Sequence, residues 1–584
     1  MARRYFEEEM RYLHEAGKRF AERHPEQARM LNIDSVTDRD PYVERLFEGF
    51  AFLTGRIHER LDDDVPEYGE QLLNLLEPAA LRPIPSLVMM AFRSKDLKQP
   101  VTLPRGTPIR SAPVGPQRTV CHFRTTQQVD LRPLRLADVS LAWTPEGTTT
   151  ARLTLRFPNP LPWKELQMNT LRLHFHAEPG LASLMHRYFT QHVARITVEP
   201  KQALALGDAG EVALTLPPEA LAPGGFGIDE RLLPQPSASF SGFSLLQEYL
   251  SFRRKFWCVD LHGLDRLDPE ATLSEVTIAV HFDRSYPEAK RFATEHVRLH
   301  CAPAVNLFSH DADPIRVAHE VSAYAVEPRQ GQELEVYDVQ RVVGMDTRTG
   351  ARHEYTPLYR LPGTANGEGR RYATQRRSGP AGRPKVYLQL NTRGISNALT
   401  EETLSVDLRC TNGTLPRERL QEGMITELGP EAPGGVTAVN LTAPTLTLRL
   451  PQERSGGLPW EFVGHRALNY RTVAQRATLV GLLAWYDWTD DRAQQRLRQG
   501  IRKVQWSPKE RVHRGAILRG AEVTIELNET HLPNEGEAVL LGQVLSRFLS
   551  MYATLNSFVH LTLVLIPSGT TYTWTPPAGH RPML

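Results

Sequence analysis

The sequence is poor in the residues that build disulfide frameworks and zinc sites. Its four cysteines, Cys121, Cys258, Cys301 and Cys410, are far apart and form no C-x-x-C pair. We therefore expect neither a disulfide framework nor a zinc site, and a reducing compartment fits this composition.

Long apolar runs are also missing. The first ten residues, MARRYFEEEM, are charged and lack the apolar core of a signal peptide. The longest apolar run, near Phe558 to Ile566, contains His560 and Thr562 and is about half the length needed to span a bilayer. We expect a soluble, intracellular protein that reaches a membrane only through partners.

No charge of one sign dominates. With 69 basic and 67 acidic residues the net charge is +2, which gives no global field toward nucleic acid or anionic lipid. The Arg-rich stretch at 370–385 is the one strongly basic segment, and Tyr372 is its one aromatic residue. Few apolar residues between Pro362 and Pro384 predict a solvated loop, with an acidic protein partner favoured over nucleic acid.

Motifs for nucleophilic catalysis and nucleotide binding are missing too. The chain has no G-x-S-x-G elbow and no G-x-x-x-x-G-K-[ST] loop. His174 and His176 alternate on an expected strand without other ligands at a recognisable spacing. The carboxylates at 62–64 suit a helix cap, and Asp311 and Asp313 suit a turn. We expect no catalytic residue, metal or cofactor.

Residues 1–86 carry the clearest positive signal, which is helical periodicity. Apolar residues at spacings of three and four predict three helices in this region. The first runs from Phe6 to Phe20, and the third, a short one, from Glu67 to Leu76. A second helix starts at Asp40, which can cap it, and Pro41, which suits the first position. The apolar seam of that second helix consists of Val43, Leu46, Phe50, Leu53 and Ile57.

This second helix also carries Phe47 and Phe52, so its apolar surface is wider than a three-helix core requires. The excess favours an intermolecular bundle, whereas an internal bundle of the three helices stays the alternative. The candidate partner-binding residues are Val43, Leu46, Phe47, Phe50, Leu53 and Ile57.

The rest of the chain reads as α+β, with several β-rich domains and a mixed carboxyl-terminal unit. We divide it into a helical arm at 1–86, a β-rich α+β domain at 87–308, a second β-rich domain at 309–455 and a carboxyl-terminal α+β domain at 456–584. Alternation or β-branched content predicts strands at 148–157, 171–176, 276–282, 317–326, 333–339, 386–391, 404–409, 522–527 and 559–566. Helices are predicted at 182–192, 245–256, 474–485 and 537–552.

The last domain contains an expected pair of neighbouring elements. Leu541, Leu545, Phe548 and Tyr552 line one face of the helix at 537–552, and the strand that follows should pack on it. The tail from Pro567 has little to pack against itself. It should dock on a domain or on a neighbouring subunit.

An ordered set of short motifs along the whole chain resembles one family. The matching segments are RYFEEEM at 4–10, DPYVERLFEGFAFL at 40–53, LRPIPS at 81–86, CAPAVNLF at 301–308, LNY at 468–470, RGAEV at 519–523, VLSRFL at 544–549, NSF at 556–558 and WTPP at 574–577. They are similar to those of the TssF family, also called VasA or ImpG, of type VI secretion baseplate subunits.

The resemblance implies a structural role with no enzymatic activity. Two copies of such a subunit would join one TssG in a wedge, together with TssE and TssK. Six wedges would surround the spike protein VgrG, contact one another, and form the platform for the contractile sheath and tube. The location implied is cytoplasmic, at the baseplate docked on the inner membrane of a Gram-negative bacterium, with no nucleic acid partner.

The alternative from another class is a soluble β-rich enzyme, such as a carbohydrate-active hydrolase. Its least implausible carboxylates are Glu248 and Asp260, which lie near Tyr249, Phe252 and Trp257 in the sequence. An enzyme should be well behaved alone, whereas a scaffold subunit should need its partners.

Overall fold

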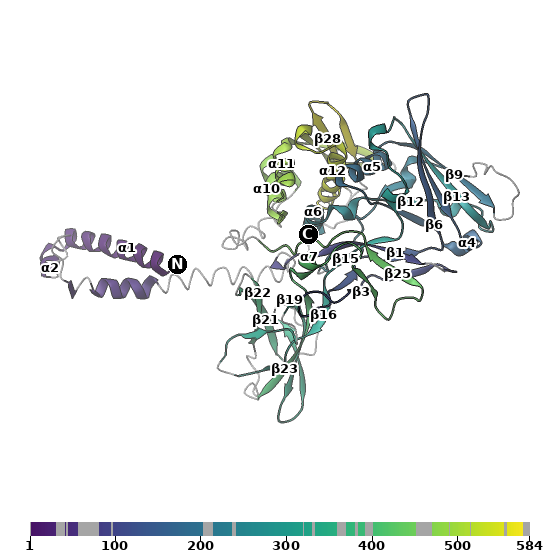
Figure 1. Ribbon diagram of the computed structural model, residues 1–584. Helices are drawn as coiled ribbons and strands as arrows, with labels where there is room; N and C mark the ends of the chain where they lie inside the picture. Colours follow the sequence, from purple (N-terminus) through teal and green to yellow (C-terminus); the bar gives the residue numbers. More distant parts are fainter. Residues whose placement is uncertain are drawn as a thin grey trace. The chain divides into compact units, whose positions relative to one another are not determined.

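The computed structural model describes residues 2–30, 41–42, 45–55, 81–94, 97–202, 214–235, 241–318, 321–329, 333–358, 369–379, 383–391, 401–450, 470–489, 491–513, 516–553 and 557–575. The described residues form two compact units, the amino-terminal helices, here called the arm, and the remainder from Arg82 onward, here called the body (Figure 1). The expected α+β class with an amino-terminal helical segment is confirmed. None of the described helices is both long and apolar enough to cross a bilayer.

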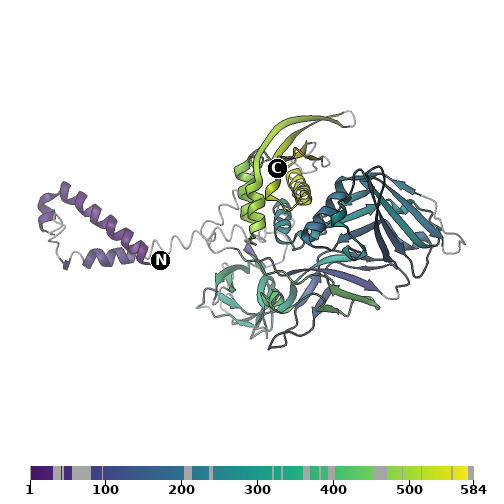
Figure 2. The same ribbon diagram turned by 45° about the horizontal axis from the view of Figure 1, so that its top comes forward.

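The arm contains α1 (Ala2–Arg23), α2 (Pro25–Met30) and further helical residues at 41–42 and 45–55. Pro25 separates the first two helices because it has no N–H to continue α1 and suits the first turn of α2. The expected first helix is confirmed, and so is the second over its described part (Figures 1 and 2). The third helix, at 67–76, and the carboxylates at 62–64 lie outside the described residues.

A six-stranded sheet in the body is buried on both faces. Its strand β1 (Leu87–Ser94) alternates between two cores: Val88 and Met90 point into one, and Leu87 and Met89 into the other. A strand buried on both faces reads as a continuous apolar run rather than an alternation. The sheet order is β24 (Ile425–Leu428), β3 (Pro108–Ser111), β4 (His122–Thr125), β15 (Cys301–Val305), β1 and β25 (Val436–Asn440). A separate two-stranded sheet pairs β2 (Val101–Leu103) with β5 (Val129–Leu131).

Two further antiparallel sheets confirm the strands expected near 148–157, 171–176 and 276–282. One has the order β10 (Leu214–Leu216), β9 (Val193–Gln202), β13 (Leu273–Phe282), β7 (Thr149–Arg156) and β6 (Arg135–Trp143). The other has the order β11 (Leu221–Pro223), β12 (Cys258–His262), β8 (Thr170–Phe175) and β14 (Val297–Arg298). The expected helices are α5 (Pro179–Gln191) and α6 (Ser241–Ser251), the latter followed by a 3-10 turn at Arg253–Phe256. A short helix, α4 (Trp163–Leu166), precedes β8.

The largest sheet confirms the strands expected at 333–339, 386–391 and 404–409, the first as part of a longer strand. It consists of β16 (Phe308–Asp311), β23 (Glu402–Thr411), β19 (Glu335–Asp346), β20 (Arg352–Pro357), β21 (Arg371–Ser378), β22 (Pro384–Asn391) and β18 (Tyr324–Val326), with β17 (Ile315–Arg316) also paired to β23.

The single strand expected at 317–326 is wrong. The chain is in a strand at β17 and again at β18, and between them the backbone N–H of Ala318 donates to the Tyr324 hydroxyl at 3.1 Å rather than to a neighbouring strand.

The Arg-rich stretch is not the solvated loop that its composition predicts. Strand β21 pairs with β22 along its whole length, and Tyr372 is buried. Just before this strand, the buried Arg370 forms an ion pair with Glu402, and the Tyr355 hydroxyl donates to Glu402 at 2.8 Å. Because these partners neutralise and cover the arginine, a segment with few apolar residues still takes part in a sheet. Residues 359–368 and 380–382 lie outside the described part.

The carboxyl-terminal sheet has the order β26 (Ile501–His513), β27 (Ala516–Asn528), β28 (Ser557–Ile566) and β29 (Thr571–Trp574), with β27 and β28 parallel. The helix between the two parallel strands, α12 (Glu535–Ser550), packs on β28 as expected (Figure 1). Almost every residue of α12 is buried, because α5 and α6 pack on this helix in addition to the sheet. Helices α9 (Tyr470–Val473), α10 (Arg476–Tyr486) and α11 (Arg492–Gly500) precede this sheet.

The tail from Pro567 packs on its own domain through β29, which lies at the edge of the carboxyl-terminal sheet. The Tyr572 hydroxyl donates to Glu535 at 2.9 Å, and the Trp574 ring lies against Gly542 of α12. Of the two docking sites that the sequence leaves open, a domain or a neighbour, this part of the tail uses the domain.

The division of the chain at residues 86, 308 and 455 stays a prediction. The six-stranded sheet draws its strands from three distant stretches of sequence, which supply β1, β3 and β4, then β15, and then β24 and β25. A short helix, α7 (Leu415–Arg419), lies between β23 and β24. Contacts across the sequence boundaries therefore hold the body together.

Candidate partner-binding surface

The helical residues 45–55 of the arm present one apolar face to solvent. Side chains three and four positions apart lie on the same side of a helix, so Leu46, Phe50 and Leu53 share this face. Their exposed fractions are 71%, 60% and 60%, which are high for large apolar side chains. We call these three residues the exposed seam.

A different face of the same helix packs inside the arm. Ala51 and Gly55 are buried, and Phe47 is half-buried. The Phe47 ring lies 6.3 Å, centroid to centroid, from the ring of His14 in α1. Packing within the arm therefore uses the face of Phe47 and leaves the exposed seam uncovered.

Exposed apolar side chains are concentrated in the arm. A contiguous patch of this kind marks interaction sites, whereas single exposed apolar residues are ordinary. The large apolar residues of the arm that are mostly or partly exposed are Tyr12, Phe20, Tyr42, Leu46, Phe50, Phe52 and Leu53.

The structure separates the predicted partner-binding residues into groups. Leu46, Phe50 and Leu53 come together on the exposed seam, whereas Phe47 faces His14 within the arm. Val43 and Ile57 lie outside the described residues. Contact of these residues with a partner stays a prediction.

The carboxylates of the enzyme alternative are engaged in separate structural contacts. Glu248 forms a buried ion pair with Lys255 and accepts from the backbone N–H of Leu232 at 2.9 Å. Asp260 accepts two hydrogen bonds from the Arg172 guanidinium, both at 2.6 Å. Two such bonds to one arginine fix the position of a carboxylate. The neighbouring aromatic side chains are buried and present no ring to a substrate: Tyr249, Phe252 and Trp257.

His174 on β8 and His176, which directly follows this strand, have the surroundings of packed side chains. Burial lowers the pKa of His174 to about 3, with further lowering by His176 and Arg254, so the imidazole is neutral at pH 7. Burial also lowers the pKa of His176. Within the part of the chain that the structure describes, no three His, Cys, Asp or Glu side chains gather as metal ligands would.

Asp311 and the four cysteines also lie in positions that structural packing explains. The turn expected at Asp311 is wrong, because this residue ends β16 opposite Asp407 of β23. All four cysteines are buried free thiols, and burial raises the pKa of each to about 12. Thiols with so high a pKa are poor nucleophiles.

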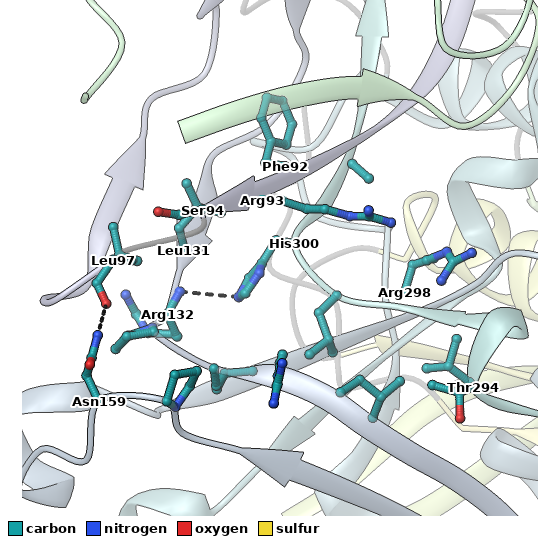
Figure 3. Close-up of a pocket in the computed structure, with 18 residues that line it drawn as sticks. Phe92, Arg93, Ser94, Leu97, Leu131, Arg132, Asn159, Thr294, Arg298 and His300 are labelled. Carbon is teal, nitrogen blue, oxygen red and sulfur yellow. Dashed lines mark hydrogen bonds between the residues drawn. The ribbon is translucent and has the colours of Figure 1, made fainter. Parts of the chain in front are cut away.

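Sequence reasoning missed a group of arginines in the body. Arg93, Arg132 and Arg298 line a pocket with His300 (Figure 3). They come from β1, from the segment before β6 and from β14, which are far apart in the sequence. No local spacing could have indicated this pocket, because only strand pairing brings these segments together.

Comparisons with known proteins agree over the whole length. The family model for "Type VI secretion system, TssF" matches residues 2–581. The type VI secretion system component TssF1 of Pseudomonas aeruginosa is 27% identical over 628 residues, covering 99% of this chain and 99% of that protein.

Solved structures are similar in fold as well. A chain in the cryo-electron microscopy structure of the TssK-TssF-TssG baseplate subcomplex has 33% identity and a TM-score of 0.80, covering 93% of this chain and 99% of that chain. A chain in the baseplate complex from the type VI secretion system has 30% identity and a TM-score of 0.63, covering 99% of this chain and 100% of that one. The protein thus belongs to the TssF family of the type VI secretion system.

Proposed function

We propose that this protein is a structural subunit of the type VI secretion baseplate, where it scaffolds assembly of the contractile sheath and tube around the spike. Its family membership and its similarity to chains of two baseplate structures support this role. The observation that carries the proposal at the level of residues is the exposed seam of the arm.

TssG and TssK are the partners that we propose first, because the similar subcomplex contains both. We extend the proposal to TssE, to VgrG, to a second copy of this chain and to neighbouring wedges, with two copies for each TssG. The site of action would be the cytoplasmic side of the inner membrane, where the baseplate docks.

Burial of the exposed seam supplies the free energy for a helical contact with TssG. Fully burying a Leu or Phe side chain stabilises by about 1.5–3 kcal/mol. The three side chains of the seam lie on one helical face and can therefore enter one groove together. A carboxylate at such a position would be buried without a partner, which costs several kcal/mol.

The test replaces Phe50 and Leu53 by Asp in the full chain, co-expressed with TssG. We expect the double variant to stay folded and to lose co-purification with TssG, because both positions are exposed in the isolated arm. The matched control places two carboxylates elsewhere in the arm, as Arg19→Asp with Arg45→Asp, since both positions are exposed and neither is three or four residues from a residue of the seam. This control should co-purify with TssG normally.

Circular dichroism and thermal unfolding establish that each variant is folded. Normal co-purification of a folded Phe50→Asp, Leu53→Asp variant would contradict the interface. Equal loss in both double variants would assign the effect to the added charge rather than to the seam.

A further inference from the structure

The body contains a pocket whose lining is basic and apolar. It encloses about 540 Å³ where β1, the segment before β6 and residues 294–300 meet. Volumes of this order are typical of ligand pockets. Figure 3 shows Arg93 and Arg298 toward one end and Arg132 with His300 toward the other.

Arg132 is held in place by two residues with left-handed backbones. Its backbone N–H donates to Nε2 of His300 at 3.2 Å, and its guanidinium donates to the carbonyl oxygen of Gln167 at 3.2 Å. His300 has a φ of 53° and Gln167 a φ of 50°. Non-glycine residues rarely adopt this conformation, and such strain clusters at ligand sites.

Among the described residues that line this pocket, the charges are unbalanced. Arg93, Arg132, Arg135 and Arg298 line it, and no Asp or Glu is among the described residues of the lining. Arg132 has one carboxylate nearby, Asp130 at 3.8 Å, which is 45% exposed. Burial lowers the pKa of His300 to about 4, so its ring adds no charge at pH 7.

Two arginines also have polar atoms without partners. The Nε atoms of Arg132 and Arg298 are buried and make no hydrogen bond. The side chain of Arg132 is only 10% exposed. Because the two Nε atoms are closed to solvent, a ligand in the pocket would contact the terminal guanidinium nitrogens, and the planar guanidinium fork matches a carboxylate geometrically.

We propose that this pocket binds carboxylate side chains of an acidic, leucine-containing peptide segment of a baseplate partner. The inference rests on the proposed function, which makes a protein segment the expected occupant. Leu97, Leu134 and Leu136 supply apolar lining between the arginines. Nucleic acid is disfavoured because Phe92, the lining phenylalanine, is buried in the core and offers no face for base stacking.

The test uses the full chain purified with TssG and a fluorescein-labelled short peptide that alternates Glu and Leu. Fluorescence anisotropy measures its affinity, and a peptide alternating Gln and Leu is the isosteric comparison. We expect the Glu peptide to bind, with affinity falling as salt rises. The variant Arg132→Gln with Arg298→Gln should bind it at least about tenfold more weakly.

Arg132 and Arg298 are partly buried, so replacing them could unfold the protein, and a second variant tests the proposal in that event. Arg93→Gln with Arg135→Gln alters only exposed side chains and should also weaken binding. The matched control is Arg341→Gln, which removes an exposed arginine of the largest sheet and should leave the affinity unchanged.

Equal binding of the Glu and Gln peptides, or unchanged affinity in the Arg93→Gln, Arg135→Gln variant, would overturn the pocket proposal. Stronger competition by a single-stranded oligonucleotide than by unlabelled Glu peptide would overturn the assignment to carboxylates. Failure of the wild-type chain to co-purify with TssG would contradict the proposed function instead, so the two failures are distinguishable.

Discussion

His186 of α5 and Gln543 of α12 form a buried hydrogen bond, with Nε2 of His186 2.7 Å from Oε1 of Gln543. The amide nitrogen of Gln543 in turn donates to the Thr190 hydroxyl at 3.1 Å. The carboxamide oxygen can only accept, so His186 carries its proton on Nε2. This bond ties the carboxyl-terminal helix to a helix from an early part of the chain.

Gln543→Leu should lower the free energy of unfolding by about 1–3 kcal/mol, because it leaves a buried N–H of His186 without an acceptor. Urea denaturation monitored by circular dichroism measures this loss. The double variant with His186→Leu removes both partners and should be less destabilised than the sum of the two single variants. Additive losses would show that the two side chains are not coupled.

Acid should destabilise the body partly through His186. Burial lowers its pKa from 6.5 to about 4, although the bond to Gln543 opposes the shift. Between these values the unfolded chain binds more protons than the folded one, so stability is lost as pH falls from about 6.5 to 4. His186→Gln should reduce this loss by about 3 kcal/mol. Parallel stability curves for the wild type and the variant would contradict the assignment.

Asp338 links two arginines in the core of the body. Arg82 lies 2.9 Å from it, and Nε of Arg409 donates to it at 2.8 Å. Burial alone would raise the pKa of Asp338, but Arg409 and Arg82 outweigh burial and hold it below its usual value. Asp338→Asn should therefore lower the free energy of unfolding by about 3–5 kcal/mol, because two guanidinium groups lose their counter-charge.

Glu354→Gln is the control for Asp338→Asn, since it breaks an exposed ion pair with Arg341 in the same sheet. Exposed ion pairs contribute little to stability, so Glu354→Gln should lower the free energy of unfolding by less than about 1 kcal/mol. Chemical denaturation of both variants at neutral pH makes the comparison. Similar losses in the two variants would contradict the structural importance of Asp338.

Gly542 allows the Trp574 ring to lie against α12. A Cβ at this position would overlap the ring, so Gly542→Ala should destabilise by about 1–3 kcal/mol despite the better helix propensity of alanine. Gly481 of α10 is exposed and has open space around it. Gly481→Ala should instead stabilise by up to about 1 kcal/mol. Differential scanning calorimetry of the pair tests the contact, and a stable Gly542→Ala variant would refute it.

Elements with strong local periodicity could be predicted from the sequence. The helix of the exposed seam follows from Leu46, Phe50 and Leu53 at helical spacing, and β28 follows from the alternation after Val559. Both patterns depend on which side of the backbone each residue occupies. The family resemblance likewise came from motifs that can be read along the chain.

Elements that depend on distant partners could not be predicted. Strand β21 is ordered by β22, and Arg370 just before it by Glu402 of β23. Likewise, α12 is covered by α5 and α6, and the local pattern within 535–550 does not identify these two distant helices as its partners.

The first two helices of the arm, the seam of the second helix and the family can be read from the amino-acid sequence, because they depend on local spacing and on motif order. Tertiary packing places Phe47 inside the arm and leaves Leu46, Phe50 and Leu53 exposed. It alone brought the arginines of β1 and β14 into one pocket. The physical reason is that burial and ion pairing act between residues close in space, and folding brings together groups that the chain keeps far apart.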